Sequence, residues 1–184
     1  MPLESKRIAK ILLETPSEAA WKKAIEVDNV LQKNSVGTAV RQSRLIRKRL
    51  STLDNVAWTL IAERESEISH QLLFAAAIKQ NKLLGDFMRN VYTNSQQRME
   101  SDIVAANWED FLTECAHLDS TVADWNDSTK LKIYNSIIGI LVETKYLRDH
   151  KTMQLTPRSL HPVVQSYLHD RGENYLLDCL ERAK

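Results

Sequence analysis

Two helical segments separated by a break occupy residues 15–50, which read TPSEAAWKKAIEVDNVLQKNSVGTAVRQSRLIRKRL. The first segment opens with the hydroxyl of Thr15, a proline, and the carboxylate of Glu18 three residues after the cap, which is the capping-box pattern. Apolar residues then recur at helical spacing towards Lys33. We therefore predict a helix over most of residues 15–33.

A second helix is predicted to follow the break at residues 34–37 and to reach about Leu50. Ser35 or Thr38 can cap it, because a hydroxyl oxygen accepts a hydrogen bond from the free N–H groups of the first turn. Two helices joined by a tight turn form a helix-turn-helix, in which the first helix supports the second and the second is offered to a groove of DNA. We therefore predict a helix-turn-helix over about residues 16–50.

Basic residues accumulate in this part of the chain. Residues 1–50 contain 11 Lys and Arg against 5 Asp and Glu, whereas residues 51–184 contain 14 against 19. No acidic residue occurs between Asp28 and Asp54. At about 100° per residue, four basic side chains of the second helix share an arc of roughly 120°, while its apolar side chains point towards a core. The basic residues are Arg41, Arg44, Arg47 and Lys48, and the apolar residues are Ala39, Ile46 and Leu50.

The cationic face of this helix predicts contacts with double-stranded DNA. Residues near the helix N-terminus would lie closest to base edges or phosphate, and residues farther along would follow the DNA backbone. Acidic partners three or four residues away are absent, which leaves the charge open to phosphates. A solvated helix face without a ligand is the alternative interpretation. The predicted DNA-binding residues of this region are Lys33, Ser35, Thr38, Arg41, Gln42, Arg44, Arg47 and Lys48.

A second helix-turn-helix is predicted at about residues 108–147. A helix near Trp108, a short connector and a long helix that opens at Asp127 follow one another there. Lys130 and Lys132 lie near the start of the long helix, and we add both to the predicted DNA-binding residues. Lysines near a helix start are more often solvated charge, so this second site is the weaker hypothesis.

The whole chain is predicted to be all-α, a compact globular bundle of about eight to ten helices, because only 4 Gly and 4 Pro occur in 184 residues. A division near residues 98–106 would give an N-terminal lobe of residues 1–100 and a C-terminal lobe of residues 101–184. A loop or short strand is expected in residues 147–155. The other predicted helices span about residues 4–14, 55–65, 67–81, 82–98, 108–118, 127–147, 162–169 and 173–182, with N-caps at Asp54, Ser66, Asn107, Asn126 and His161.

Two Glu-x-x-His pairs are the strongest candidates for metal chemistry. The pairs are Glu67 with His70 and Glu114 with His117, and di-iron carboxylate sites combine two such pairs with further glutamates, one of which Glu143 could supply. Such pairs also arise by chance, so ordinary histidines are the favoured interpretation. The two cysteines lack metal-ligand spacing, and no P-loop, Gly-x-Ser-x-Gly elbow or dinucleotide fingerprint occurs. We predict no enzyme activity, no cofactor and no metal.

The sequence also predicts a cytoplasmic protein without membrane contact. Its start lacks a basic-then-apolar leader, and both cysteines, Cys115 and Cys179, lie in apolar stretches. The most apolar runs, residues 72–78 and 137–142, are far shorter than the roughly 20 residues that a bilayer span requires. We expect a monomer.

Five strings of the sequence, spread over nearly its whole length, resemble the BrxA family, a small component of bacteriophage exclusion (BREX) defence systems. They are PLESKRIAKILL (2–13), EAAWKKAIEVDNVLQKNSVGTAVRQSRLIRKRL (18–50), LLFAAAIKQNKLLGDFM (72–88), FLTECAHLD (111–119) and LTPRSLHPVVQSYL (155–168).

The resemblance implies an all-α cytoplasmic protein that binds double-stranded DNA through helix-turn-helix elements. It also implies that the protein works beside the system's DNA methyltransferase and other large components, in systems that methylate host DNA and block phage replication. Two alternatives stay open. The protein could be a scaffold whose basic helix docks on an acidic surface of another defence component, or an RNA-binding module similar to antitermination proteins.

Overall fold

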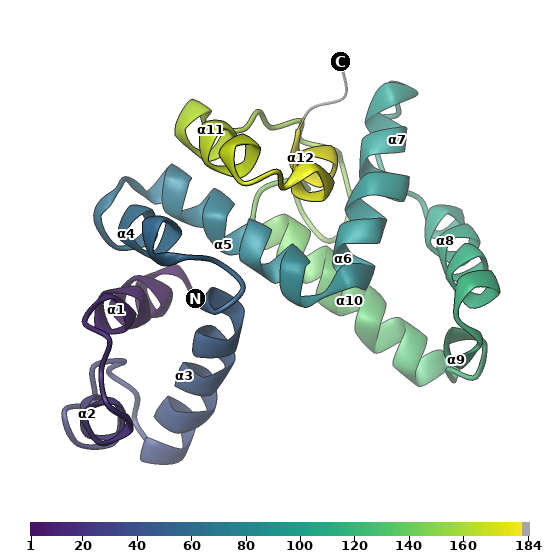
Figure 1. The fold of residues 1–184 in the computed structure, drawn as a ribbon. Coiled ribbons are helices and arrows are strands. Elements are labelled where there is room, and N and C mark those ends of the chain that lie inside the picture. The colour runs from purple at the N-terminus through teal and green to yellow at the C-terminus, as the bar shows by residue number, and fades with distance from the viewer. Residues whose placement is uncertain (182–184) are drawn as a thin grey trace. The chain divides into compact units, whose positions relative to one another are not determined.

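A computed structural model describes residues 1–181 of the chain, and within them the structure consists of helices and irregular connections without any strand; the connection over residues 144–161 is long (Figure 1). The predicted all-α class is confirmed. Two isolated β-bridges, Asp102 with Gln154 and Leu147 with Leu155, pair short extended stretches where a loop or short strand was expected. No helix in residues 1–181 is long and apolar enough to cross a bilayer.

The chain divides into two units whose boundaries differ from the predicted lobes. The first unit comprises Met1–Gln80 and His161–Arg171, and the rest of the described chain forms the second. Residues 98–106, where the boundary was predicted, lie within the second unit. Ile103 is buried and its N–H donates to the Met153 carbonyl, and the Ser101 carbonyl accepts from the N–H of Leu155.

The first unit is built around α1, which packs against α3, α4 and α5, while α11 packs on α5. Its core contains the fully buried side chains of Ile8, Ile61 and Leu72. The helices of this unit are α1 (Pro2–Leu13), α2 (Glu18–Lys22), the π-helical η1 (Lys23–Val27), α3 (Val36–Leu50), α4 (Asn55–Glu63), α5 (Ser66–Gln80) and α11 (Pro162–Asp170).

The helix formed by α2 and η1 starts and stops at other residues than predicted. Its N-cap is Ser17, whose hydroxyl accepts a hydrogen bond from the Ala20 N–H. Thr15, the predicted cap, has a φ of 46° and belongs to the reversal after α1. The helix ends at Val27 instead of continuing towards Lys33.

The early end follows from the backbone of the connector, residues 28–35. Asn29 and Gln32 have φ values of 46° and 53°, and residues in this left-handed region end a right-handed helix. Asn29 closes the connector on itself, since its Nδ2 donates to the Lys33 carbonyl and its Oδ1 accepts from the Lys33 N–H, both at 3.0 Å. This connector is longer than the turn of three to four residues that is usual in a helix-turn-helix.

The second unit contains an aromatic core around Phe87. The Phe87 ring lies 5.9 Å from that of Trp108 and 5.3 Å from that of Phe111, and Tyr92 packs edge-on against Tyr146 at 5.3 Å. The helices of this unit are α6 (Lys82–Phe87), the π-helical η2 (Met88–Tyr92), α7 (Thr93–Gln97), α8 (Ala105–Leu118), α9 (Ser120–Ala123), α10 (Asp127–Glu143) and α12 (Asn174–Leu180).

Three predicted N-caps, Asp54, Asn126 and His161, are confirmed by side-chain hydrogen bonds to the first turns of α4, α10 and α11. The predicted cap Asn107 is wrong. α8 begins earlier, and the Asn107 Oδ1 instead accepts from the backbone N–H of Val104, the residue before the helix.

Ser66 is the first residue of α5 rather than its cap. Two predicted helix ends also differ from the structure. α10 ends at Glu143 instead of Leu147, because Lys145 adopts a left-handed φ of 63°. α12 ends at Leu180, and Arg182, its predicted end, lies outside the described residues.

Asp54 ties α11 to the rest of the first unit. Its Oδ1 accepts from the Ala57 N–H at 3.0 Å and from the Tyr167 hydroxyl at 3.1 Å, and its Oδ2 accepts from Nε of Arg171. The Arg171 guanidinium also lies 4.0 Å from the centre of the Tyr167 ring. Burial disfavours the charged carboxylate, but these three hydrogen bonds outweigh that effect and hold the pKa of Asp54 below its ordinary value of 3.8.

Replacing Asp54 with asparagine keeps an oxygen that can cap α4 but removes the charge that faces Arg171, so it should destabilise the first unit by about 0.5–1 kcal/mol. A carboxylate with a lowered pKa stabilises the fold above its ordinary pKa and loses that effect as the pH falls through the folded value. The difference from wild type should therefore shrink below about pH 4. Urea unfolding followed by circular dichroism at several pH values measures it, with Asp110→Asn as the matched control on an exposed carboxylate. A loss that does not depend on pH would contradict the role of the charge.

Candidate nucleic-acid interface

The two faces of α3 are arranged as its sequence predicted. Ala39, Ile46 and Leu50 are at most 3% exposed and pack into the first unit. Arg41 and Lys48 are exposed on the opposite side. The helix therefore has an apolar inner face and a cationic outer face.

Ser35 and Thr38 fix the start of this helix. The Ser35 hydroxyl accepts from the Thr38 N–H at 3.2 Å and donates to the Thr38 Oγ1 at 2.9 Å. The predicted capping role of Ser35 is confirmed. Both hydroxyl groups are engaged with each other, so their first role is to define where α3 begins.

A shallow groove of about 750 Å³ runs along the outer face of α3. Apolar and basic side chains alternate along it at helical spacing. It is lined by Val36, Gly37, Val40, Arg41, Arg44, Leu45 and Lys48 of α3, together with Glu26 of η1.

Three cations of this face are unpaired. Within residues 1–181, no carboxylate lies within ion-pair distance of Arg41, Arg44 or Lys48, and all three side chains are exposed. Their positions differ by three, four and seven residues, which places them on one side of the helix. The structure thus brings three of the predicted residues together as an open cationic strip.

Lys33, also predicted to bind DNA, is instead half-buried in an ion pair. Its Nζ lies 2.7 Å from Oε1 of Glu4 in α1, and the two side chains are 21% and 20% exposed. The hydrogen bond from Lys33 and the nearby positive charge hold the pKa of Glu4 below its ordinary value of 4.5. Lys33 therefore anchors the connector to α1.

Arg47 also forms an ion pair, with Glu18 at the start of α2. Its Nη2 lies 2.7 Å from Oε1 of Glu18, and its Cζ lies 4.5 Å from the centre of the Trp21 ring. The hydrogen bond from Arg47 lowers the pKa of Glu18. Arg47 holds α2 against α3, so reversing its charge would disturb the helix pair itself.

Gln42 does not lie fully on the open face. It is half-buried, and its Oε1 is buried without a hydrogen-bond partner in the part of the chain that the structure describes. A buried acceptor without a donor costs free energy. Gln42 was predicted to lie near base edges because it is close to the N-terminus of the helix, but its position on the helix turns it partly inward.

The polar contacts of α1 with the connector were missed by sequence reasoning. Arg7 donates from Nη1 to the Val30 carbonyl and from Nη2 to Oε1 of Gln32, both at 2.9 Å. Arg7 lies three residues after Glu4 on α1, so the two side chains share a face of the helix. This shared polar face was the signal in the sequence that could have predicted contacts of α1 with another segment.

The second predicted DNA-binding pair has a different setting. Lys130 lies in the lining of a groove of the second unit, and Lys132 is exposed nearby on α10. Residues 105–132 contain six carboxylates and these two lysines, a formal net charge of −4. The surroundings of Lys130 and Lys132 are therefore acidic rather than cationic.

The two Glu-x-x-His pairs belong to different units of the chain. Glu67 and His70 belong to the first unit, and Glu114 and His117 to the second. Within residues 1–181, no group of three or more His, Cys, Asp and Glu is placed to hold a metal ion. Cys179 is buried with its Sγ 3.2 Å from the Gly85 carbonyl, and burial raises the pKa of its thiol to about 12.

These observations define an all-α protein whose first unit presents an open cationic strip, formed by Arg41, Arg44 and Lys48 on α3. Comparison with known proteins agrees with the resemblance noted in the sequence. The family model BrxA matches residues 1–172. The chain belongs to the BrxA family.

Its relatives cover nearly the whole chain. The BREX protein BrxA of Paramagnetospirillum magneticum is 39% identical over 97% of this chain and 89% of its own length. The BREX protein BrxA of Escherichia coli O9:H4 is 33% identical over 98% and 85%. A crystal structure of an uncharacterized protein from Magnetospirillum magneticum superposes with a TM-score of 0.83 at 38% identity, covering 97% of this chain and 91% of that one.

Replacing Lys33 with alanine should lower the free energy of unfolding of the first unit by about 0.5–1 kcal/mol, because it removes a half-buried ion pair. In a Glu4→Gln background the same replacement should cost less. This coupling should be present above pH 4.5 and vanish as the pH falls through the lowered pKa of Glu4, since a protonated carboxyl group no longer attracts the ammonium.

A double-mutant cycle by urea unfolding at neutral and acidic pH measures this coupling. Lys10→Ala, which removes an exposed lysine of α1, serves as the control for loss of a single charge. Equal coupling at both pH values would show that Lys33 and Glu4 do not interact through charge.

Proposed function

We propose that this BrxA-family chain is a non-enzymatic subunit of a BREX phage-defence system that binds double-stranded DNA through the outer face of α3. The observation that carries the proposal is the open cationic strip formed by Arg41, Arg44 and Lys48. Family membership supports the BREX setting, since the similar proteins carry the name BREX protein BrxA.

The size of α3 fits a DNA groove. A helix rises 1.5 Å per residue, so the strip from Arg41 to Lys48 extends over roughly 10 Å. The major groove of B-DNA is about 12 Å wide and admits one α-helix. Because the three cations lie on one side of α3, the helix could enter the groove with its charges directed at one phosphate strand.

Apolar residues of the same groove add a second kind of contact. Val36 is 54% exposed and Leu45 is 42% exposed, and both line the groove with the cations. In the major groove of DNA, thymine presents a methyl group that apolar side chains contact. The mixture of arginine and aliphatic residues therefore suits base pairs as well as phosphates.

The start of α3 also favours anions. The helix has 15 residues, and its first turn contains no acidic residue. The exposed N–H groups and the helix dipole attract phosphate at such an end. The helix start at Ser35 is therefore partly positive, as is the cationic strip on the same helix.

The chemistry of this face supports a binding role rather than catalysis. Its groove contains aliphatic, arginine and lysine side chains and one glutamate, Glu26, which lies 3.9 Å from Nζ of Lys22. These groups can attract and position a polyanion. The DNA methyltransferase and other large BREX components are the natural partners of such a subunit, which would contribute its hold on DNA.

Reversing the charge of Arg41 and Arg44 together should abolish binding to a DNA duplex in a gel shift. With three phosphate contacts, the slope of log affinity against log salt is expected near −3 for the wild-type chain, and each single Arg41→Ala or Arg44→Ala variant should reduce it by about 1. Arg47 is left intact because its guanidinium holds α2.

The matched control reverses Lys130 and Lys132 to glutamate, which makes the same change in net charge in the second unit. This control should keep duplex affinity within about twofold, and circular dichroism should show folded protein for both variants. Retained binding after the α3 reversal would remove α3 from DNA recognition.

Competition with single-stranded DNA and RNA tests the RNA alternative. Release of a protein partner by the same reversal, with unchanged DNA binding, would support the scaffold alternative.

Gly37→Ala separates folding from DNA contact at the start of α3. A Cβ at this position meets no atom within 4 Å, so alanine should leave the fold unchanged or stabilise it by about 0.5–1 kcal/mol. If phosphate approaches the backbone at the α3 N-terminus, the added methyl group should weaken duplex affinity several-fold. Thermal unfolding and gel shift measure the two effects. Unchanged affinity would place the DNA farther along the helix.

A further inference from the structure

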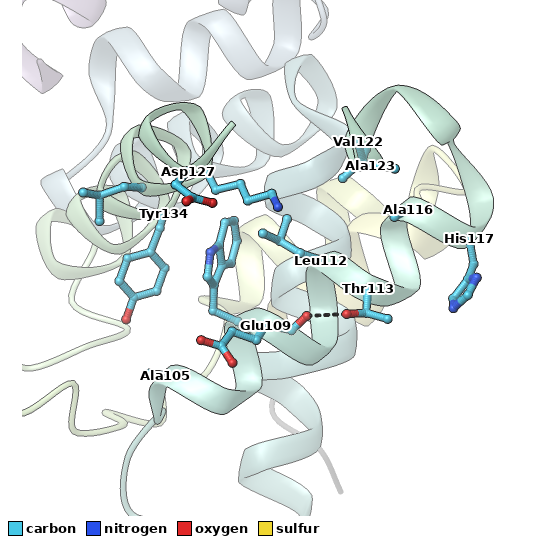
Figure 2. A pocket seen from close by; sticks show the side chains of 13 residues that line it. Ala105, Glu109, Leu112, Thr113, Ala116, His117, Val122, Ala123, Asp127 and Tyr134 are labelled. Carbon is cyan, nitrogen blue, oxygen red and sulfur yellow. Dashed lines mark hydrogen bonds between the residues drawn. The ribbon is translucent and has the colours of Figure 1, made fainter. Parts of the chain in front are cut away.

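A second groove, of about 770 Å³, lies in the second unit among α8, α9 and α10 (Figure 2). It is distinct in position and in charge from the face of α3. Its apolar lining comes from α8 and α9 on one side and α10 on the other. These residues are Trp108, Leu112, Ala116, Val122, Leu131 and Tyr134.

The lining residues follow helical spacing on both sides. On α8, Trp108, Leu112 and Ala116 are four residues apart, and on α10, Leu131 and Tyr134 are three residues apart. Rows of side chains at such spacing form the ridges and grooves into which a further helix packs. The lining therefore presents the ridges and grooves against which one more helix can pack.

The floor of this groove is buried and packed, while one wall is exposed. Trp108 is 7% exposed and its ring lies 5.2 Å from that of Tyr134, whose hydroxyl contacts Sδ of Met153 at 3.0 Å. Leu131, in contrast, is 59% exposed although it lines the groove. A concave apolar lining with an exposed leucine on its wall and a few charged groups at its edge is typical of a binding site.

The charges around the groove define what kind of helix fits. Glu109 and Asp127 line it directly together with one cation, Lys130, and Figure 2 shows the two carboxylates on α8 and at the start of α10. Residues 105–132 hold six carboxylates against Lys130 and Lys132. Within residues 1–181, none of these six carboxylates forms an ion pair with lysine or arginine.

We propose that this groove binds an amphipathic helix of a partner protein, with an apolar stripe flanked by lysine and arginine. The stripe would cover Trp108, Leu112 and Leu131, and the flanking cations would lie against Glu109 and Asp127. Helices bind apolar grooves through residues three, four and seven positions apart, and flanking charges select the partner. The same acidic edge would repel a nucleic-acid backbone.

Two synthetic helical peptides serve as probes in the test. Both are about 18 residues long and present leucines three, four and seven positions apart, with lysine on both flanks in one peptide and glutamate in the other. Fluorescence anisotropy of the labelled peptides measures binding to the full chain. The lysine peptide should bind saturably, at least about tenfold more tightly than the glutamate peptide, and its affinity should fall with salt.

Two variants and their matched controls locate the binding site. Leu131→Gln and Glu109→Lys should each weaken the lysine peptide about tenfold. Leu118→Gln removes a leucine that is 91% exposed at the end of α8 but outside the groove, and Asp110→Lys reverses a neighbouring carboxylate outside the lining. Both controls should change affinity by less than about twofold. Circular dichroism confirms that each variant is folded.

Several outcomes would overturn the proposal. Equal binding of both peptides, absence of saturable binding, or full affinity of Leu131→Gln would show that the groove does not select a basic helix. Sedimentation that reveals self-association abolished by Leu131→Gln would make a second copy of the chain the occupant. Displacement of the lysine peptide by a DNA duplex, together with weaker duplex binding of Lys130→Glu, would make this groove a nucleic-acid surface.

Discussion

The polar contacts between α1 and the connector set the position of α3, which carries the cationic face. Residues with positive φ in the connector are unfavourable by themselves and persist only where neighbours hold them. Arg7 supplies two hydrogen bonds to this connector, and Glu4 binds Lys33 at its end. Because the connector delivers the chain to the N-cap of α3, the direction in which α3 presents its outer face depends on these contacts with α1.

The cationic face exists because the nearby carboxylates are already engaged. Glu4 on α1 and Glu18 at the start of α2 each have a basic partner, Lys33 and Arg47, and Glu26 in the groove lies 3.9 Å from Nζ of Lys22. Those two pairs hold the helices in place, and Arg41, Arg44 and Lys48 are left without a carboxylate partner within residues 1–181. A strip of unpaired arginine and lysine is costly only in mutual repulsion, which a bound polyanion relieves.

Sequence periodicity was sufficient for the local features of the fold and insufficient for the long-range ones. The buried face of α3 follows from the 3.6-residue period, and the cap at Asp54 follows from residue type. The partners of Lys33 and Arg47 are each 29 residues away, so no local pattern reveals them. The early end of η1 depends on Asn29 entering the left-handed region, which asparagine tolerates but does not require.

The opposite charges of the two grooves provide a physical basis for using one small chain on two partners. The chain has 25 basic and 24 acidic residues, so its total charge directs it to neither. Each groove instead carries its own field over a distance of about one Debye length, roughly 8–10 Å at physiological salt. A polyanion attracted to α3 is repelled by the carboxylates of α8, and a basic helix suited to that groove is repelled by Arg41 and Arg44. Repulsion of the wrong partner at each site gives selectivity even where the apolar contacts resemble each other.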